Sequence, residues 1–143
     1  EAGIINTDVA QAVRRRLYLN HTDIKMLFKV NPESDVYLAE RSLQKITKSI
    51  LFHCFPDGLC VSGVSAGSET DDDILKDVKA VADSVPVFCN TGCTAQNVAQ
   101  KLSVVDGVCV GTAFKKDGKF ENQVELQRVV EFMDAVRAYR ATK

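Results

Sequence analysis

The chain has 143 residues, enough for one domain with a real hydrophobic core, and its 45% apolar and 26% charged content is ordinary for a soluble globular protein. The formal net charge of −1 gives no reason to expect nucleic acid or an anionic membrane as a partner. No apolar run approaches the roughly 18 residues of a membrane span. We expect no signal peptide, although the first residue is Glu1 rather than Met. The sequence therefore predicts a single domain over residues 1–143.

Helical patterns and short apolar runs alternate along the chain, which predicts parallel strands joined by helices. The expected helices cover residues 8–19, 36–52, a stretch opening at 70–73, 94–103 and 123–140. The expected strands cover residues 23–30, 59–63, 86–89 and 107–110. In parallel sheets of this kind, ligands bind at the carboxyl ends of the strands.

A helix followed by four strand–helix pairs predicts an α/β fold of the (β/α)₈ TIM-barrel type, here a half-barrel of about four parallel strands with flanking helices. A complete barrel needs about 250 residues, so this chain is too short to close one alone. Two uncovered sheet edges and an apolar interior invite pairing. We therefore expect self-association, or association with the missing half of the barrel.

The five cysteines are odd in number, so at least one thiol cannot join an intrachain disulfide. Cys60, Cys89 and Cys109 fall inside predicted buried strands, where cysteine behaves as a small apolar residue. We expect free thiols and a reducing compartment, either the cytoplasm or an organelle matrix. Cys89 and Cys93 have CxxxC spacing with no nearby His, which favours a structural role over a metal site. We expect neither a metal nor a cofactor.

Two glycine turns mark the expected ligand site. Gly92, with Cys93 and Thr94, follows the third strand, and Gly111, with Thr112, follows the fourth. The loops after the last two strands form the common phosphate site of this fold, because glycine lets the backbone approach an anion and a helix start offers free N–H groups. The alternative is that these glycines serve only tight turns.

Lysines at strand ends are further candidates. Lys115 either reaches over the site as a point charge or belongs to a solvated turn over residues 115–118. Lys29, near the end of the first strand, is a weak candidate for a catalytic base if it points into the barrel, where burial would lower its pKa. Ser62 and Ser65 could contact a ligand or satisfy loop backbone.

Other polar groups have simpler explanations. The acids Asp71, Asp72 and Asp73 could hold Mg²⁺, but acids at a helix start explain them as well. We assign no catalytic role to His21 or His53, because neither lies at a predicted strand tip.

Several motifs resemble the carboxyl-terminal half of the BtpA/SgcQ family of (β/α)₈ barrels. Residues 106–118, DGVCVGTAFKKDG, are similar to the family's closing-strand motif, and residues 92–98, GCTAQNV, to its seventh-strand turn. Residues 38–42, LAERS, also fit. The resemblance implies that the four strands are barrel strands five to eight. The family's usual Lys-His pair after the fifth strand is replaced by Glu33 and Ser34, which removes cationic groups from the barrel mouth.

The residues and the resemblance together predict a protein of the BtpA/SgcQ type that binds a small phosphorylated metabolite through Gly92, Cys93, Thr94, Gly111, Thr112 and Lys115. The alternative is a non-catalytic assembly or stability factor acting through protein–protein contacts, since a photosystem assembly role is associated with BtpA. The sequence does not decide whether the protein is an enzyme.

Overall fold

The computed structural model describes residues 3–33 and 35–143. Four parallel strands form one sheet in the order β1-β2-β3-β4. Their bounds are β1 Leu27–Lys29, β2 Gly58–Val61, β3 Val87–Cys89 and β4 Gly107–Val108. The expected parallel arrangement is confirmed, although all four strands are shorter than predicted, the first and last most of all.

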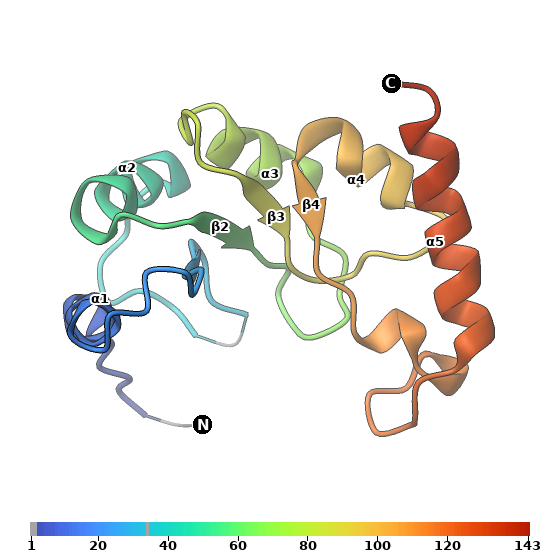
Figure 1. Ribbon diagram of the computed structural model, residues 1–143, viewed down its shortest axis with the longest axis horizontal. Helices are drawn as coiled ribbons and strands as arrows, with labels where there is room; N and C mark the ends of the chain where they lie inside the picture. The colour runs from blue at the N-terminus through green and yellow to red at the C-terminus, as the bar shows by residue number, and fades with distance from the viewer. Residues whose placement is uncertain (1–2, 34) are drawn as a thin grey trace.

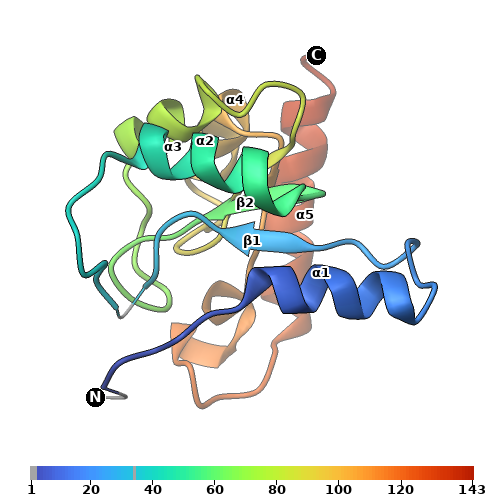
Figure 2. The same ribbon diagram turned by 90° about the vertical axis from the view of Figure 1, so that its left-hand side faces the viewer.

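The described residues form five α-helices, most of them packed on one face of the sheet. They are α1 Val9–Tyr18, α2 Leu43–Cys54, α3 Asp72–Lys79, α4 Val98–Val104 and α5 Leu126–Arg140, and two short 3-10 helices, η1 Thr112–Phe114 and η2 Lys116–Gly118, precede α5. Helices α2, α3 and α4 lie on one face of the sheet, with α5 beyond α4 (Figure 1). Helix α1 lies by β1, below the α2–α3 layer in Figure 2. No helix in the described part of the chain is long and apolar enough to cross a membrane. Four parallel strands with helices packed on one face form the half-barrel that the sequence predicts.

The core lies between the sheet and the helix layer. Successive side chains of a strand point to opposite faces, so alternate residues of each strand meet the helices. The fully buried residues of this face are Leu59, Val61, Val87 and Cys89 of the strands and Val30 directly after β1, and they pack with Leu75, Val78 and Val98 of the helices. This layer holds the strand ends, and therefore the loops beyond them, in place.

The opposite face of the sheet is the inner face of the half-barrel, and Phe88 of β3 lies across its centre. A Cβ atom on Gly58 of β2 would lie 2.9 Å from the Phe88 ring, and one on Gly107 of β4 would lie 2.6 Å from it. The ring therefore occupies the side-chain space at Gly107, and at Gly58 it does so together with the Leu27 side chain, whose Cδ2 would lie 2.5 Å from the added Cβ. The outer strands of the half-barrel, β1 and β4, are the two edges of the sheet. The self-association expected from such edges stays a prediction.

The predicted helix over residues 36–52 begins too early. Helix α2 starts at Leu43, after Ser42, whose side chain accepts a hydrogen bond from the Lys45 N–H and caps the helix. The preceding segment is held as a loop by the Tyr37 hydroxyl, which donates to the Val30 carbonyl at 2.5 Å. Leu38, expected on the buried stripe, is 92% exposed.

The last helix also begins later than predicted, at Leu126 rather than near residue 123. Val124, which lies inside the helix predicted over residues 123–140, is exposed and instead forms an antiparallel bridge with Lys115. The Glu125 N–H donates to the Phe114 carbonyl at 2.8 Å. These bonds fold residues 115–125 into a compact excursion between β4 and α5.

Candidate functional site

A pocket of about 530 Å³ opens at the carboxyl ends of the strands, a volume typical of small-molecule sites. Loops after β2, β3 and β4 line it, together with residues of α5. Phe114 and Phe132 form one wall, with ring centroids 5.2 Å apart in an edge-on contact. The structure places all six expected ligand-site residues on this pocket, namely Gly92, Cys93, Thr94, Gly111, Thr112 and Lys115.

Gly111 is an open position of the pocket backbone. A Cβ atom placed there would meet nothing within 4 Å, and the φ of −130° is accessible to any residue. The backbone N–H groups of Gly111, Thr112 and Ala113 find no acceptor within the ranges that the structure describes. Gly111 is exposed and Thr112 and Ala113 are only partly buried, so these N–H groups are accessible to a bound acceptor. Neither a positive φ nor a close neighbour therefore accounts for a glycine at this position.

Gly92 has a different reason to be glycine. Its φ is +71°, and a Cβ atom there would lie 2.3 Å from the Glu69 Cα in the loop after β2. The turn after β3 is therefore packed tightly against that neighbouring loop. This geometry accounts for Gly92 without a ligand.

Helix α4 begins at Val98, whereas the sequence predicted a start near Thr94. The residues before it form a turn in which the Asn97 side chain accepts from the Thr94 N–H at 2.8 Å and donates to the Gly92 carbonyl at 3.0 Å. The Asn97 amide thus organises the loop, so Thr94 does not cap the helix. Thr94 remains on the pocket wall.

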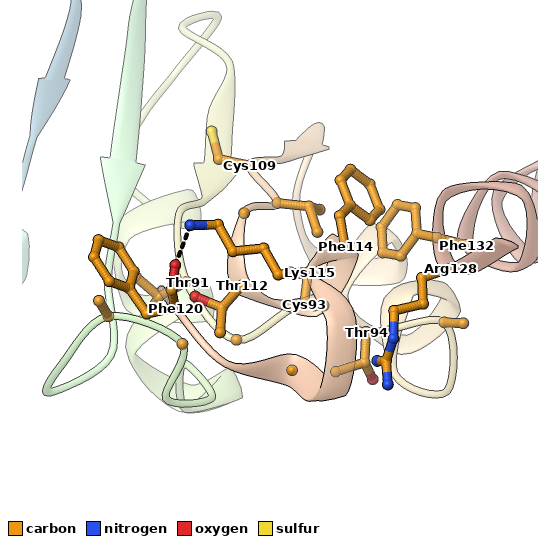
Figure 3. A pocket seen from close by; sticks show the side chains of 18 of the residues that line it. Thr91, Cys93, Thr94, Cys109, Thr112, Phe114, Lys115, Phe120, Arg128 and Phe132 are labelled. Atoms are coloured by element: carbon orange, nitrogen blue, oxygen red, sulfur yellow. Dashed lines mark hydrogen bonds between the residues drawn. The ribbon is translucent and has the colours of Figure 1, made fainter. Parts of the chain in front are cut away.

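Two cations border the pocket. The Lys115 ammonium donates to the Phe120 carbonyl and lies 4.4 Å from the centre of the Phe120 ring (Figure 3). The turn expected over residues 115–118 is confirmed by the Gly118 N–H, which donates to the Lys115 carbonyl at 2.9 Å. Arg128 of α5 extends toward Thr94 in Figure 3, and its Nε donates to Glu125 at 2.9 Å. Arg128 was not among the predicted site residues, because nothing in the pattern of an amphipathic helix distinguishes it.

The expected base, Lys29, is not buried in this chain. Its side chain is 58% exposed, and its ammonium lies 3.6 Å from the Glu33 carboxylate. The burial on which a base role depended is therefore missing. Ser62 is fully buried and bonded to its neighbours, whereas Ser65 bonds within its own loop. Ser34, the other residue in place of the family's Lys-His pair, lies outside the described residues.

All five cysteines are free, and two thiol pairs lie near the pocket. The Cys93 thiol donates to the Cys89 sulfur at 3.3 Å, which lowers the pKa of Cys89 to about 6 against the opposing effect of burial. The same bond raises the pKa of Cys93. On the inner face, a hydrogen bond from Cys60 lowers the pKa of Cys109 to about 7, and that bond together with burial raises the pKa of Cys60. Cys109 is only half-buried and follows β4 rather than lying inside it.

A buried lysine that the sequence analysis did not single out supports the loop after β2. Lys101 of α4 is 1% exposed, and its ammonium donates to the Thr70 carbonyl at 2.7 Å and binds Glu69 at 2.7 Å and Asp72 at 2.6 Å. Burial alone would lower the pKa of Lys101, but the two carboxylates raise it above its usual value. The ammonium thus holds the loop that packs against Gly92.

The acids Asp71, Asp72 and Asp73 lie at the start of α3, as the sequence predicted. The Asp71 side chain accepts from the Asp73 N–H at 2.8 Å and caps α3, while Asp72 binds Lys101. Across residues 3–33 and 35–143 there is no group of three or more His, Cys, Asp or Glu side chains suited to a metal ion. His21 is paired with Asp23 at 3.5 Å, and His53 stacks edge-on against Phe52.

Comparisons with known proteins agree with the resemblance. Residues 1–138 match the model of the BtpA family. The chain is 41% identical over 138 residues to the putative sgc region protein SgcQ of Escherichia coli, covering 96% of this chain and 52% of that protein. It is 24% identical over 136 residues to the photosystem I biogenesis protein BtpA of Synechocystis, covering 95% of this chain and 47% of that protein.

The fold has solved counterparts. N-(5'-phosphoribosyl)anthranilate isomerase from Pyrococcus furiosus superposes with a TM-score of 0.57 at 17% identity, over 90% of this chain and 57% of that one. At such low identity the likeness concerns the fold alone. The chain spans about half the length of the curated relatives it matches.

Proposed function

This chain belongs to the BtpA family, and we propose that it binds a small phosphorylated metabolite in the pocket at the carboxyl ends of β2, β3 and β4. The observation that carries the proposal is the backbone of Gly111, Thr112 and Ala113, whose N–H groups lack acceptors in the described residues and which line the pocket. Hydrogen bonds from N–H groups to an anion are among the strong ones. The open position at Gly111 leaves room for the anion.

The charges around the pocket suit an anion that is held mainly by backbone. Lys115 and Arg128 share the lining with Glu33 and Glu131, so the formal charges of the lining side chains cancel. Arg128 is partly engaged by Glu125, and Lys115 by Phe120. Binding is therefore assigned to the N–H groups, with the two cations as support, and no catalytic residue is assigned.

Calorimetric titration of the full-length native protein with inorganic phosphate, phosphorylated sugars and nucleotides tests this proposal. Gly111→Val is expected to weaken binding by about tenfold or more, because its side chain would occupy the proposed anion space, where a Cβ atom meets nothing within 4 Å. Ala141→Val, which adds bulk on the exposed carboxyl-terminal cap of α5, is the matched control. Absence of binding to every phosphate compound, or equal binding by Gly111→Val, would refute the proposal.

A non-catalytic assembly factor is the second candidate, and the relative named for photosystem I biogenesis supports it. Protein–protein contacts would then use surface outside the pocket. The Gly111→Val variant separates the two candidates, since an assembly factor keeps its partner in a pull-down when the pocket is filled.

A further inference from the structure

A second polar feature borders the same pocket, where β1, β2 and β3 end. The Glu33 carboxylate there is held by three groups that all meet its Oε1 atom. The Ser62 hydroxyl donates to Oε1 at 3.3 Å, the Asn90 Nδ2 donates at 3.0 Å, and the Lys29 ammonium lies at 3.6 Å. The carboxylate is therefore oriented by its surroundings rather than free to rotate.

The supporting residues are themselves fixed. The Asn31 side chain donates to the Ser62 carbonyl at 2.6 Å and accepts from the Ser62 N–H at 3.0 Å, which ties the end of β1 to the end of β2. The Asn90 Nδ2 donates also to the Ser62 hydroxyl at 2.9 Å. Since both contacts of this amide nitrogen are to oxygen acceptors, the orientation of the Asn90 amide is determined.

Two acceptor atoms remain for a ligand. In the part of the chain that the structure describes, the Glu33 Oε2 and the Asn90 Oδ1 have no hydrogen-bond or ion-pair partner, and both residues line the pocket. A carboxylate oxygen and an amide oxygen only accept hydrogen bonds. This end of the pocket therefore selects a ligand group that donates.

The local charge favours a neutral donor over an ammonium group. Lys29 already lies beside Glu33 and neutralises its charge, so a second cation would gain little. Hydroxyl groups satisfy acceptors without adding charge. The geometry also suits a short ligand, because Asn90 follows β3, next to β4, and neighbouring strands are about 4.8 Å apart.

Resting on the proposed phosphate function, we propose that the ligand is a phosphorylated sugar or polyol. Its phosphate binds the N–H groups of Gly111, Thr112 and Ala113, and its hydroxyls donate to the Glu33 Oε2 and the Asn90 Oδ1. Donors at one end of the pocket and acceptors at the other thus match the two ends of one small molecule.

The test compares ligands that share the phosphate and differ in hydroxyls. Calorimetry of the full-length native protein uses inorganic phosphate, n-butyl phosphate and a panel of pentose and hexose phosphates. At least one sugar phosphate is expected to bind about tenfold tighter than n-butyl phosphate, as two added hydrogen bonds allow. Glu33→Gln is expected to remove most of that difference while n-butyl phosphate binds as before or more tightly.

Glu131→Gln is the matched control, because Glu131 lines the same pocket from α5. Removing either negative charge should strengthen binding of any phosphate through general electrostatics, so weaker sugar-phosphate binding in Glu33→Gln alone supports a direct contact. Equal binding of n-butyl phosphate and every sugar phosphate would overturn the hydroxyl site and leave the phosphate site standing. If no phosphate compound binds at all, both proposals fail.

Discussion

Replacing Lys101 with methionine is expected to lower the free energy of unfolding by about 3 kcal/mol, because the change leaves buried acceptors without their donor. Methionine matches the length of the lysine stem, so the apolar packing of this 1% exposed side chain is largely kept. What disappears is the ammonium group shared by Thr70, Asp72 and Glu69.

The magnitude follows from the three acceptors. The Thr70 carbonyl belongs to a fully buried residue, and an unsatisfied buried group costs about 1–3 kcal/mol. Asp72 is 20% exposed and keeps its bond from Gln100, so its lost charge-assisted bond is worth about 1–2 kcal/mol. Glu69 is 58% exposed and adds little. Relief from burying the ammonium offsets part of this sum.

Urea denaturation monitored by circular dichroism measures the effect, with an expected midpoint shift of roughly 1.5 M for a slope near 2 kcal/mol/M. Lys76→Met is the matched control, since the Lys76 ammonium contacts the exposed Asp73 at 3.0 Å and is itself exposed. That control is expected to change stability by less than about 0.5 kcal/mol. A loss below about 1 kcal/mol in Lys101→Met would show that this ammonium does not hold the loop after β2.

Two further predictions concern the turn after β3 and the start of β1. Gly92→Ala should lower the free energy of unfolding by about 2 kcal/mol or more, since its φ is +71° and its Cβ would lie 2.3 Å from the neighbouring loop backbone. Gly111→Ala should change the free energy of unfolding by less than about 0.5 kcal/mol, and similar melting temperatures for the two variants would contradict this. The Met26 N–H and the Arg16 guanidinium lower the pKa of Asp57. A lowered pKa gives stability that is present above the unfolded value near 3.9 and is lost as pH falls through the folded value. Asp57→Asn should therefore lower stability at pH 7 and flatten its acid dependence in urea titrations between pH 5 and 2; an unchanged acid slope would refute the assignment.

Local patterns predicted most elements but not all of their starts. The strands and α3 were expected from apolar runs and acids at a helix start. Thr7 and Asp8 were both plausible caps of the first helix, and the structure selects Asp8, whose side chain accepts from the Gln11 N–H at 2.8 Å. The start of α2 was misplaced because Leu38 fits the helical period, while the long-range bond from Tyr37 to Val30 keeps that segment out of the helix. Apolar spacing reports which residues could share a face, not whether a partner surface exists for them.

In the candidate site, too, some residues could be predicted from local sequence patterns and others could not. Gly111 and the turn at Lys115 were predicted because glycine and turn residues after strands leave a local mark in the sequence. Arg128 and Lys101 carry no such mark, and Glu33 was noted only as a departure from the family's Lys-His pair, not as a ligand-site residue. Their roles depend on contacts between residues far apart in the chain, such as the bond between Asn90 and Glu33.

The sequence by itself determined the alternation of strands and helices, the half-barrel and the family, because each depends on periodicity or on contiguous motifs. Only the tertiary structure decided what each glycine turn does. The backbone around Gly92 is filled by the loop after β2, whereas the backbone at Gly111 faces open space. The two turns look alike in sequence, and they differ because packing against a distant loop consumes the space at one and leaves it free for a ligand at the other.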